Sequence, residues 1–115
     1  MKKMPFVTKD KIEEIVKEYP TPFHLYDEKG IKENAEKFIG SFSWNNGFKE
    51  YFAVKATPNP AILRILKNAG CGVDCSSLTE LMLAEDAGFK GHEIMFSSNV
   101  TPKEEYIYAK NLVQL

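Results

Sequence analysis

The sequence predicts an α/β fold that corresponds to the N-terminal portion of a (β/α)8 barrel of the TIM type, with about three βα units, truncated before closure. Short apolar runs begin near residues 51, 72 and 93, and each is followed by a helix-start signal and a helical repeat of apolar residues. The next step falls on Val113-Gln114-Leu115, which we expect to open a fourth strand. A complete barrel takes about 250 residues, so we expect these 115 residues to be part of a larger architecture.

Residues 1–50 predict a helix-strand-helix segment that precedes the barrel. Thr8 is a suitable cap for a helix over 8–19, which two prolines end. Phe23–Tyr26 alternates in polarity and predicts a short strand. Asp27 is expected to cap a second helix as far as about Ile39, and the turn-rich residues 40–50 are expected to form a loop. The buried stripe of the second helix is predicted to be Ile31, Ala35, Phe38 and Ile39.

Residues 51–115 predict the first three βα units and the start of the fourth strand. In the first unit, a strand over Tyr51–Lys55 precedes a helix over 60–69, with Asn59 as its cap and Pro60 at its first position. In the second, a strand over Gly72–Cys75 precedes a capping box at residues 77–80 and a helix that ends at Gly88. In the third, a strand over 93–96 precedes a second capping box at residues 101–104 and a helix to about residue 111.

Composition excludes several classes of protein. The 15 Lys and Arg residues nearly balance the 16 Asp and Glu residues, whereas a nucleic-acid-binding protein usually has a basic excess or a basic stripe. No apolar run approaches the roughly 20 residues that span a bilayer, and the apolar part of the start is too short for a secretory signal. We therefore expect a cytoplasmic protein that binds neither nucleic acid nor membrane.

Cys71 and Cys75 are predicted to be small buried apolar residues rather than a disulfide or a metal site. On a strand they share a face but lie about 13 Å apart, beyond the roughly 7 Å between Cα atoms that a disulfide spans. Two thiols without a nearby histidine make a poor zinc site, so we expect no metal.

Lys55 is the first candidate for catalysis. It follows an apolar strand at the carboxyl end, where parallel α/β folds collect their chemistry. Ala53 shares its face of the predicted strand and leaves space beside the amine. An amine in a partly desolvated site is a nucleophile suited to Schiff-base formation with an aldehyde. The competing interpretation is a lysine that places its charge in solvent.

Asp74 occupies the equivalent position at the end of the second strand. A cation and an anion would then converge at one mouth of the barrel. A solvated loop aspartate, or a local acceptor in a turn, is the alternative for this residue.

Four segments resemble one family, the pyridoxal-phosphate-dependent decarboxylases with an alanine-racemase-like barrel. The segments are "TPFHLYD", "YFAVKATPNPAILRIL", "GCGVDCSSLTELMLAEDAGF" and "EIMFSSNVTPKEE", in that order. The resemblance implies that Lys55 forms the Schiff base with pyridoxal 5′-phosphate, that Asp74 lies close to it, and that Ala53 lines the face of the cofactor. It also implies an amino-acid substrate and a homodimer. The branch that it resembles most decarboxylates meso-diaminopimelate in lysine biosynthesis.

Other interpretations remain open. The same fold serves decarboxylases of ornithine, lysine, arginine and carboxynorspermidine, and a non-catalytic protein that binds the cofactor or regulates a partner is a further possibility. The resemblance places the glycine-rich phosphate site, the stacking histidine and the second, β-rich domain beyond position 115. We therefore expect the 115-residue chain alone to be inactive. We also expect its open sheet edges and exposed apolar surface to make it weakly stable or prone to association.

Overall fold

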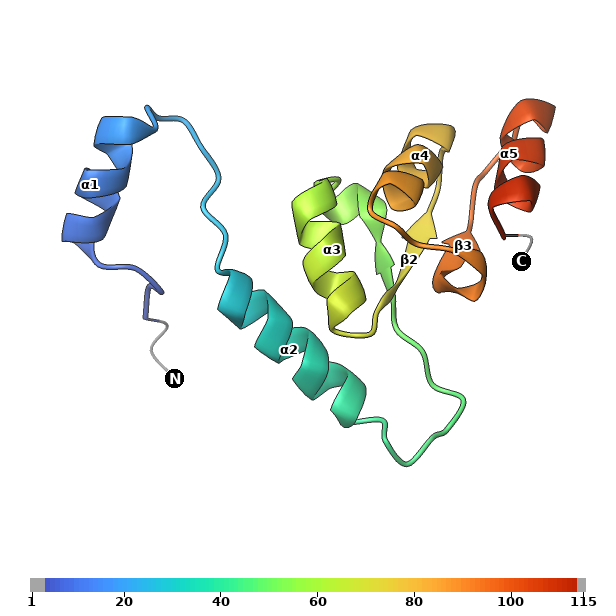
Figure 1. The fold of residues 1–115 in the computed structure, drawn as a ribbon, viewed down its shortest axis with the longest axis horizontal. Helices are drawn as coiled ribbons and strands as arrows, with labels where there is room; N and C mark the ends of the chain where they lie inside the picture. The colour runs from blue at the N-terminus through green and yellow to red at the C-terminus, as the bar shows by residue number, and fades with distance from the viewer. Residues whose placement is uncertain (1–3, 114–115) are drawn as a thin grey trace.

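The computed structural model describes residues 4–113 as a row of helices beside a small parallel sheet (Figure 1). Two helices come first, α1 (Lys9–Glu18) and α2 (Glu28–Gly40). The sheet and its helices follow in the order β1 (Tyr51–Ala53), α3 (Pro60–Asn68), β2 (Gly72–Cys75), α4 (Leu78–Asp86), β3 (Ile94–Phe96) and α5 (Lys103–Val113). Two single-turn 3₁₀ helices, η1 (Val54–Ala56) and η2 (Gly91–Glu93), adjoin β1 and β3. The predicted succession of βα units is confirmed.

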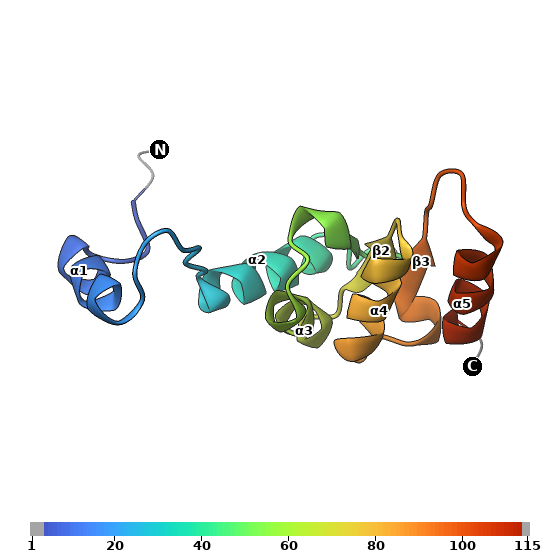
Figure 2. The same cartoon turned by 90° about the horizontal axis from the view of Figure 1, so that it is seen from above.

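The three strands are parallel and lie in the order β1-β2-β3. Phe52 pairs with Val73, and Val73 with Ile94, which places these three side chains on one face. That face packs against α3, α4 and α5. Figure 2 shows these three helices in a row along the sheet. Its core contains Val54, Leu63, Val73, Cys75, Leu81 and Phe89, each at most 1% exposed.

The opposite face of the sheet carries Ala53, Asp74 and Met95 in one row across the three strands. Met95 is 48% exposed, because no element of the described chain packs over it. In a closed barrel this face would point inward. We call it the inward face.

Local signals in the sequence explain the helix ends. The Asn59 side chain accepts a hydrogen bond from the Ala61 N–H at 2.9 Å, and Pro60 occupies the first turn of α3 as predicted. Gly70 and Gly88 follow α3 and α4 with φ values of +99° and +89°, a conformation that glycine adopts at low cost.

The two predicted capping boxes are not formed as expected. Ser77 Oγ accepts from the Glu80 N–H, but the Glu80 carboxylate binds Ser76 rather than the Ser77 backbone. The Thr101 hydroxyl donates to the Ser98 carbonyl, and α5 begins at Lys103.

The strand predicted over Phe23–Tyr26 is wrong: this segment is extended but pairs with no strand in the described part of the chain. An alternation of apolar and polar side chains does not by itself make a strand. A strand also needs a neighbouring strand whose backbone groups pair with its own N–H and C=O groups. The helix before it, α1, begins after the predicted Thr8 cap but buries no residue. Helix α1 lies away from the sheet (Figure 1).

Helix α2 packs on α3 through Ala35, with Ile62, Leu66 and Cys71 opposite. Phe38 differs from the prediction, since it is 46% exposed. It instead meets Phe42 and Phe48 of the following loop, whose rings stack 4.2 Å apart between centroids.

Two further findings concern the chain's end and its helices. The sequence predicted that the helix ends near Asn111 and that a strand begins at Val113, but α5 continues through Val113. Gln114 and Leu115, the rest of the predicted strand, lie outside the described residues. In the range 4–113, none of the helices is both long and apolar enough to cross a membrane.

Candidate active site

Lys55 lies directly after β1, in the 3₁₀ turn η1 rather than in the strand. The strand ends two residues earlier than predicted because Val54 turns into the core, where its side chain is fully buried, and its carbonyl accepts from the Thr57 N–H at 3.1 Å. The alternation that places Ala53 and Lys55 on one face therefore stops at Ala53. Lys55 nevertheless remains at the carboxyl edge of the sheet.

The Lys55 side chain is exposed. Within residues 4–113, no carboxylate lies within ion-pair distance of its amine. The partial desolvation expected from the sequence is thus not provided by the neighbouring elements described here, and an enclosure would have to come from further protein.

Asp74 lies on the inward face near the carboxyl end of β2, between Ala53 of β1 and Met95 of β3. Its carboxylate Oδ1 accepts a hydrogen bond from the Ser97 hydroxyl at 2.6 Å. The side chain is half-buried. The structure therefore brings Ala53 and Asp74 side by side and places Lys55 in the turn immediately beyond them.

The residues next to Asp74 on the inward face of β1 and β2 are small. Ala53 pairs directly with Asp74, and Gly72 lies two residues earlier on the same face of β2. A Cβ at Gly72 would lie 2.7 Å from the Tyr51 ring, because that ring lies over the glycine. The Tyr51 hydroxyl donates to the His92 carbonyl at 2.7 Å, which fixes the ring in place. This arrangement holds the Tyr51 ring over Gly72, two residues before Asp74 on the same face of β2.

A second acidic group fixes the loop after β2. The Glu80 carboxylate accepts from both the backbone N–H and the hydroxyl of Ser76, at 2.8 Å and 3.0 Å. The loop that follows Asp74 is therefore tied to the first turn of α4. We assign Glu80 a structural role in this loop, because both of its carboxylate oxygens accept hydrogen bonds from Ser76.

Both cysteines are buried and free, as predicted. Burial raises the pKa of the Cys71 thiol, and it raises the pKa of Cys75 to about 12 with smaller contributions from the charges of Glu80 and Asp74. Both thiols are therefore weaker nucleophiles near neutral pH than an exposed cysteine. Among the described residues, no cluster of three or more metal-ligating side chains is present.

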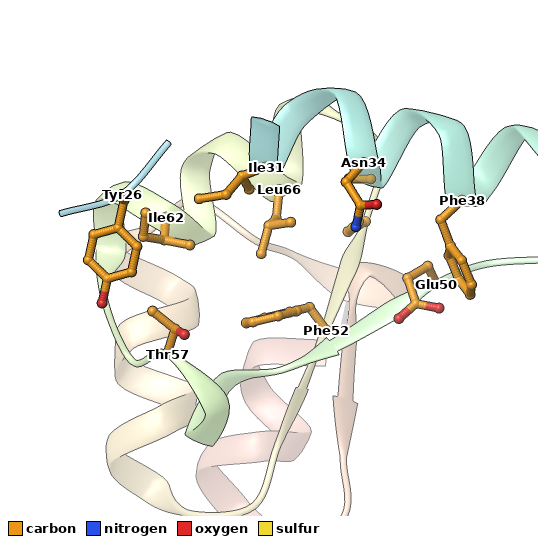
Figure 3. A pocket seen from close by; sticks show the side chains of 11 residues that line it. Tyr26, Ile31, Asn34, Phe38, Glu50, Phe52, Thr57, Ile62 and Leu66 are labelled. Carbon is orange, nitrogen blue, oxygen red and sulfur yellow. The ribbon is translucent and has the colours of Figure 1, made fainter. Parts of the chain in front are cut away.

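A cavity near this edge lies on the other side of β1. It has a volume of about 490 Å³ and lies between α2, α3 and β1 (Figure 3). Phe52 lies below Ile31 and Leu66, with Tyr26 and Thr57 at one end and Glu50 and Phe38 at the other. Because Phe52 and Ala53 point to opposite faces, this cavity is separate from the row that contains Asp74.

Ser97 was missed by sequence reasoning. It lies one residue beyond β3, two residues after Met95, so its side chain falls on the inward face. Its N–H donates to the Cys75 carbonyl at 2.9 Å, which continues the β2–β3 ladder past the end of β3. The sequence held a signal for it: Ser97 lies two residues after Met95 on the third strand, just as Lys55 lies two residues after Ala53 on the first.

Most of the chain matches one protein family. Residues 28–113 match the model of the pyridoxal binding domain of pyridoxal-dependent decarboxylases. This range contains all three candidate residues as well as Ser97.

Individual relatives support the same assignment. Protein TabA of Pseudomonas amygdali pv. tabaci is 48% identical over 95 residues, which cover 83% of this chain and 22% of TabA. The structure of diaminopimelate decarboxylase from M. jannaschii in complex with L-lysine is 34% identical with a TM-score of 0.78, over 86% of this chain and 24% of that one. Ornithine decarboxylase from Entamoeba histolytica is 27% identical with a TM-score of 0.76, over 91% and 33%. The chain thus spans about a fifth of the curated relative's length.

Proposed function

The chain belongs to the pyridoxal-dependent decarboxylases, and from this premise we propose that it forms the N-terminal part of an enzyme that decarboxylates meso-diaminopimelate. The observation that carries the proposal is the placement of Lys55 in the turn directly after β1, beside the strand β2, which carries Asp74 next to its last residue. Both residues lie inside the range that matches the family.

The side chains at this edge fit an aldehyde cofactor chemically. A primary amine condenses with an aldehyde, and a nearby carboxylate stabilises a protonated nitrogen. Lys55 is exposed, Asp74 is half-buried one strand away, and Ala53 leaves space next to it. When bound, pyridoxal 5′-phosphate supplies the electron sink that makes loss of carbon dioxide feasible.

Each residue has a distinct role in this proposal. Lys55 would hold pyridoxal 5′-phosphate through its amine. Asp74 would place a negative charge one strand away from that amine. Ala53 provides the small surface against which the flat ring of the cofactor lies.

The remainder of the site would come from protein beyond this chain. The chain spans 22% of TabA. In our proposal, residues 1–50 precede the barrel, residues 51–115 contain its first three βα units, and the complete protein is a cytoplasmic homodimer. The 115-residue chain by itself is inactive.

Similarity to diaminopimelate decarboxylase supports meso-diaminopimelate as the substrate, with lysine as the product. Ornithine is the second candidate, because the ornithine decarboxylase structure superposes with a TM-score of 0.76 over 91% of the chain. Release of carbon dioxide from meso-diaminopimelate, ornithine, lysine and arginine should be measured with the full-length protein. Turnover with meso-diaminopimelate at least tenfold above that with the other amino acids supports the proposal. A preference for ornithine would show that the reaction is a decarboxylation as proposed, but that ornithine is the substrate.

The role of Lys55 has its own test. The full-length protein, loaded with pyridoxal 5′-phosphate and reduced with borohydride, should carry the label on the peptide that contains Lys55. A label on another lysine removes Lys55 from the role. A protein that binds the cofactor at Lys55 yet releases no carbon dioxide from any amino acid would instead be a cofactor-binding or regulatory protein.

A further inference from the structure

We propose that Ser97 is a positioning residue that holds the carboxylate of Asp74 in a fixed orientation on the inward face of the sheet. The inference rests on the proposed function, because it assigns Asp74 a place next to the cofactor. It concerns a residue outside the three candidates that the sequence indicated.

The position of Ser97 is determined by the backbone. Asp74 pairs with Met95, and the ladder continues beyond the end of β3 through the hydrogen bond from the Ser97 N–H to the Cys75 carbonyl. The side chain of Ser97 therefore emerges on the same face as Asp74, one step closer to the mouth. Its hydroxyl needs no backbone movement to reach the carboxylate.

The hydrogen bond occupies one oxygen of the carboxylate and leaves the other free. Ser97 Oγ donates to Asp74 Oδ1 at 2.6 Å, within the usual range for a hydroxyl donor and an ionised acceptor. In the described structure, Oδ1 is the only oxygen of this carboxylate with a hydrogen-bond partner. Oδ2 is therefore available for a group held above β1 and β2.

Neighbouring groups do not substitute for Ser97. Ser76 lies on the loop after β2, but its hydroxyl and its N–H are both bound to Glu80. Ala53 and Met95, the register neighbours of Asp74, have no side-chain donors. Without Ser97, the Asp74 side chain would be free to rotate among its rotamers and would lose its fixed orientation.

The test uses the full-length protein loaded with pyridoxal 5′-phosphate and follows the absorbance of the bound cofactor from pH 6 to pH 10. A fixed carboxylate stabilises the protonated form of the nitrogen that links Lys55 to the cofactor. Ser97→Ala should therefore move the midpoint of the absorbance change to lower pH by about half a unit. Ser97→Thr keeps the hydroxyl and should leave the midpoint within about 0.2 units of the wild-type value.

A cycle with Asp74→Asn decides whether Ser97 acts through Asp74. In the Asp74→Asn background, Ser97→Ala should shift the midpoint by less than about 0.2 units. An unchanged midpoint in Ser97→Ala, or an equal shift with and without Asp74, overturns the inference. Borohydride labelling separates this from failure of the proposed function: a label on Lys55 with no effect of Ser97→Ala rejects only the inference, whereas a label elsewhere rejects both.

Discussion

Lys67 Nζ lies 2.5 Å from a carboxylate oxygen of Glu93, and this contact joins the last turn of α3 to the turn that precedes β3. The pair spans β2 at the amino edge of the sheet, opposite the edge that carries Lys55. Glu93 also accepts from the Lys90 N–H at 2.9 Å, and Lys67 Nζ lies 4.9 Å from the centre of the Phe89 ring. The two side chains are 27% and 33% exposed, so water screens their attraction less than that of the exposed pairs on α1 and α2.

Glu93→Gln should destabilise the protein by about 1 kcal/mol at pH 7, because it removes one charge of a partly shielded and hydrogen-bonded pair. The matched control is Glu33→Gln, whose partner Lys29 lies 3.7 Å away and whose side chains are 64% and 83% exposed. Urea unfolding should show a change below about 0.3 kcal/mol for the control. Equal effects of the two substitutions would show that the Lys67 pair contributes nothing specific.

The contribution of Glu93 should disappear in acid. Burial alone would raise the pKa of Glu93, but the hydrogen bonds from Lys67 and Lys90 and the charge of Lys67 outweigh it, so the pKa lies below its ordinary value. A carboxyl whose pKa is lower in the folded state stabilises that state fully above its unfolded pKa of about 4.3, and this contribution is lost as the pH falls through the folded pKa. The stability difference between wild type and Glu93→Gln should therefore be constant from pH 6 to 7 and shrink below about pH 4. A difference that grows in acid contradicts this.

Gly72→Ala should destabilise the protein by about 2 kcal/mol, because the added methyl would lie 2.7 Å from the Tyr51 ring and 2.7 Å from the Glu93 carbonyl oxygen. The backbone oxygen cannot move without disturbing the turn before β3. Gly40→Ala is the control, because a Cβ there meets nothing within 4 Å and alanine favours the helix. Thermal unfolding should lower the midpoint for Gly72→Ala and leave or raise it for Gly40→Ala.

Cys75 should resist iodoacetamide in the folded protein. With a pKa of about 12, only about one thiol in 10⁴ is ionised at pH 8, compared with about one in four for an ordinary cysteine. Mass spectrometry should detect no modification of Cys75 under conditions that fully modify a new exposed thiol in Ser43→Cys. Both native thiols should react once urea unfolds the protein. Fast labelling of Cys75 without denaturant would mean that β2 opens readily.

The 115-residue chain should associate in solution. Its radius of gyration is 17.1 Å, whereas a compact protein of this length has a value of about 13 Å. Helix α1 exposes an apolar stripe in which Ile12 is 39% and Val16 37% exposed. Light scattering should give a mass above 13.1 kDa that increases with concentration.

Ile12→Lys should reduce this association, because it places a charge in the apolar stripe. Glu13→Gln alters the net charge by the same amount on a more polar position and should leave association unchanged. A stable monomer for the unmodified chain at all concentrations would show that the exposed stripe does not promote contact between chains.

Elements whose ends are determined by local chemistry were the most predictable. The Asn59-Pro60 start of α3, the glycines after α3 and α4, and the bounds of β2 follow from residues that act within a few positions. Phe23–Tyr26 could not be decided in the same way, because a strand depends on a partner distant in the sequence. The end of β1 depended on whether Val54 or its neighbours filled the core, which alternation alone does not settle.

The candidate site shows the same division. The positions of Lys55 and Asp74 at the carboxyl edge follow from strand order, which the repeat of strands and helices predicts. The partnership of Asp74 with Ser97 depends on the register between β2 and β3, which nothing within either segment reveals. The exposure of Lys55 likewise depends on what surrounds β1, and not on the residues next to it in the sequence.

The order of the strands also bears on how the chain folds during its synthesis. Each strand pairs with the one made just before it, and partners in both ladders, such as Tyr51 with Gly72 and Val73 with Ile94, lie 21 positions apart. Closing a loop of that length costs little more entropy than closing one half as long. The sheet can therefore grow strand by strand as the ribosome delivers it, without waiting for segments translated later.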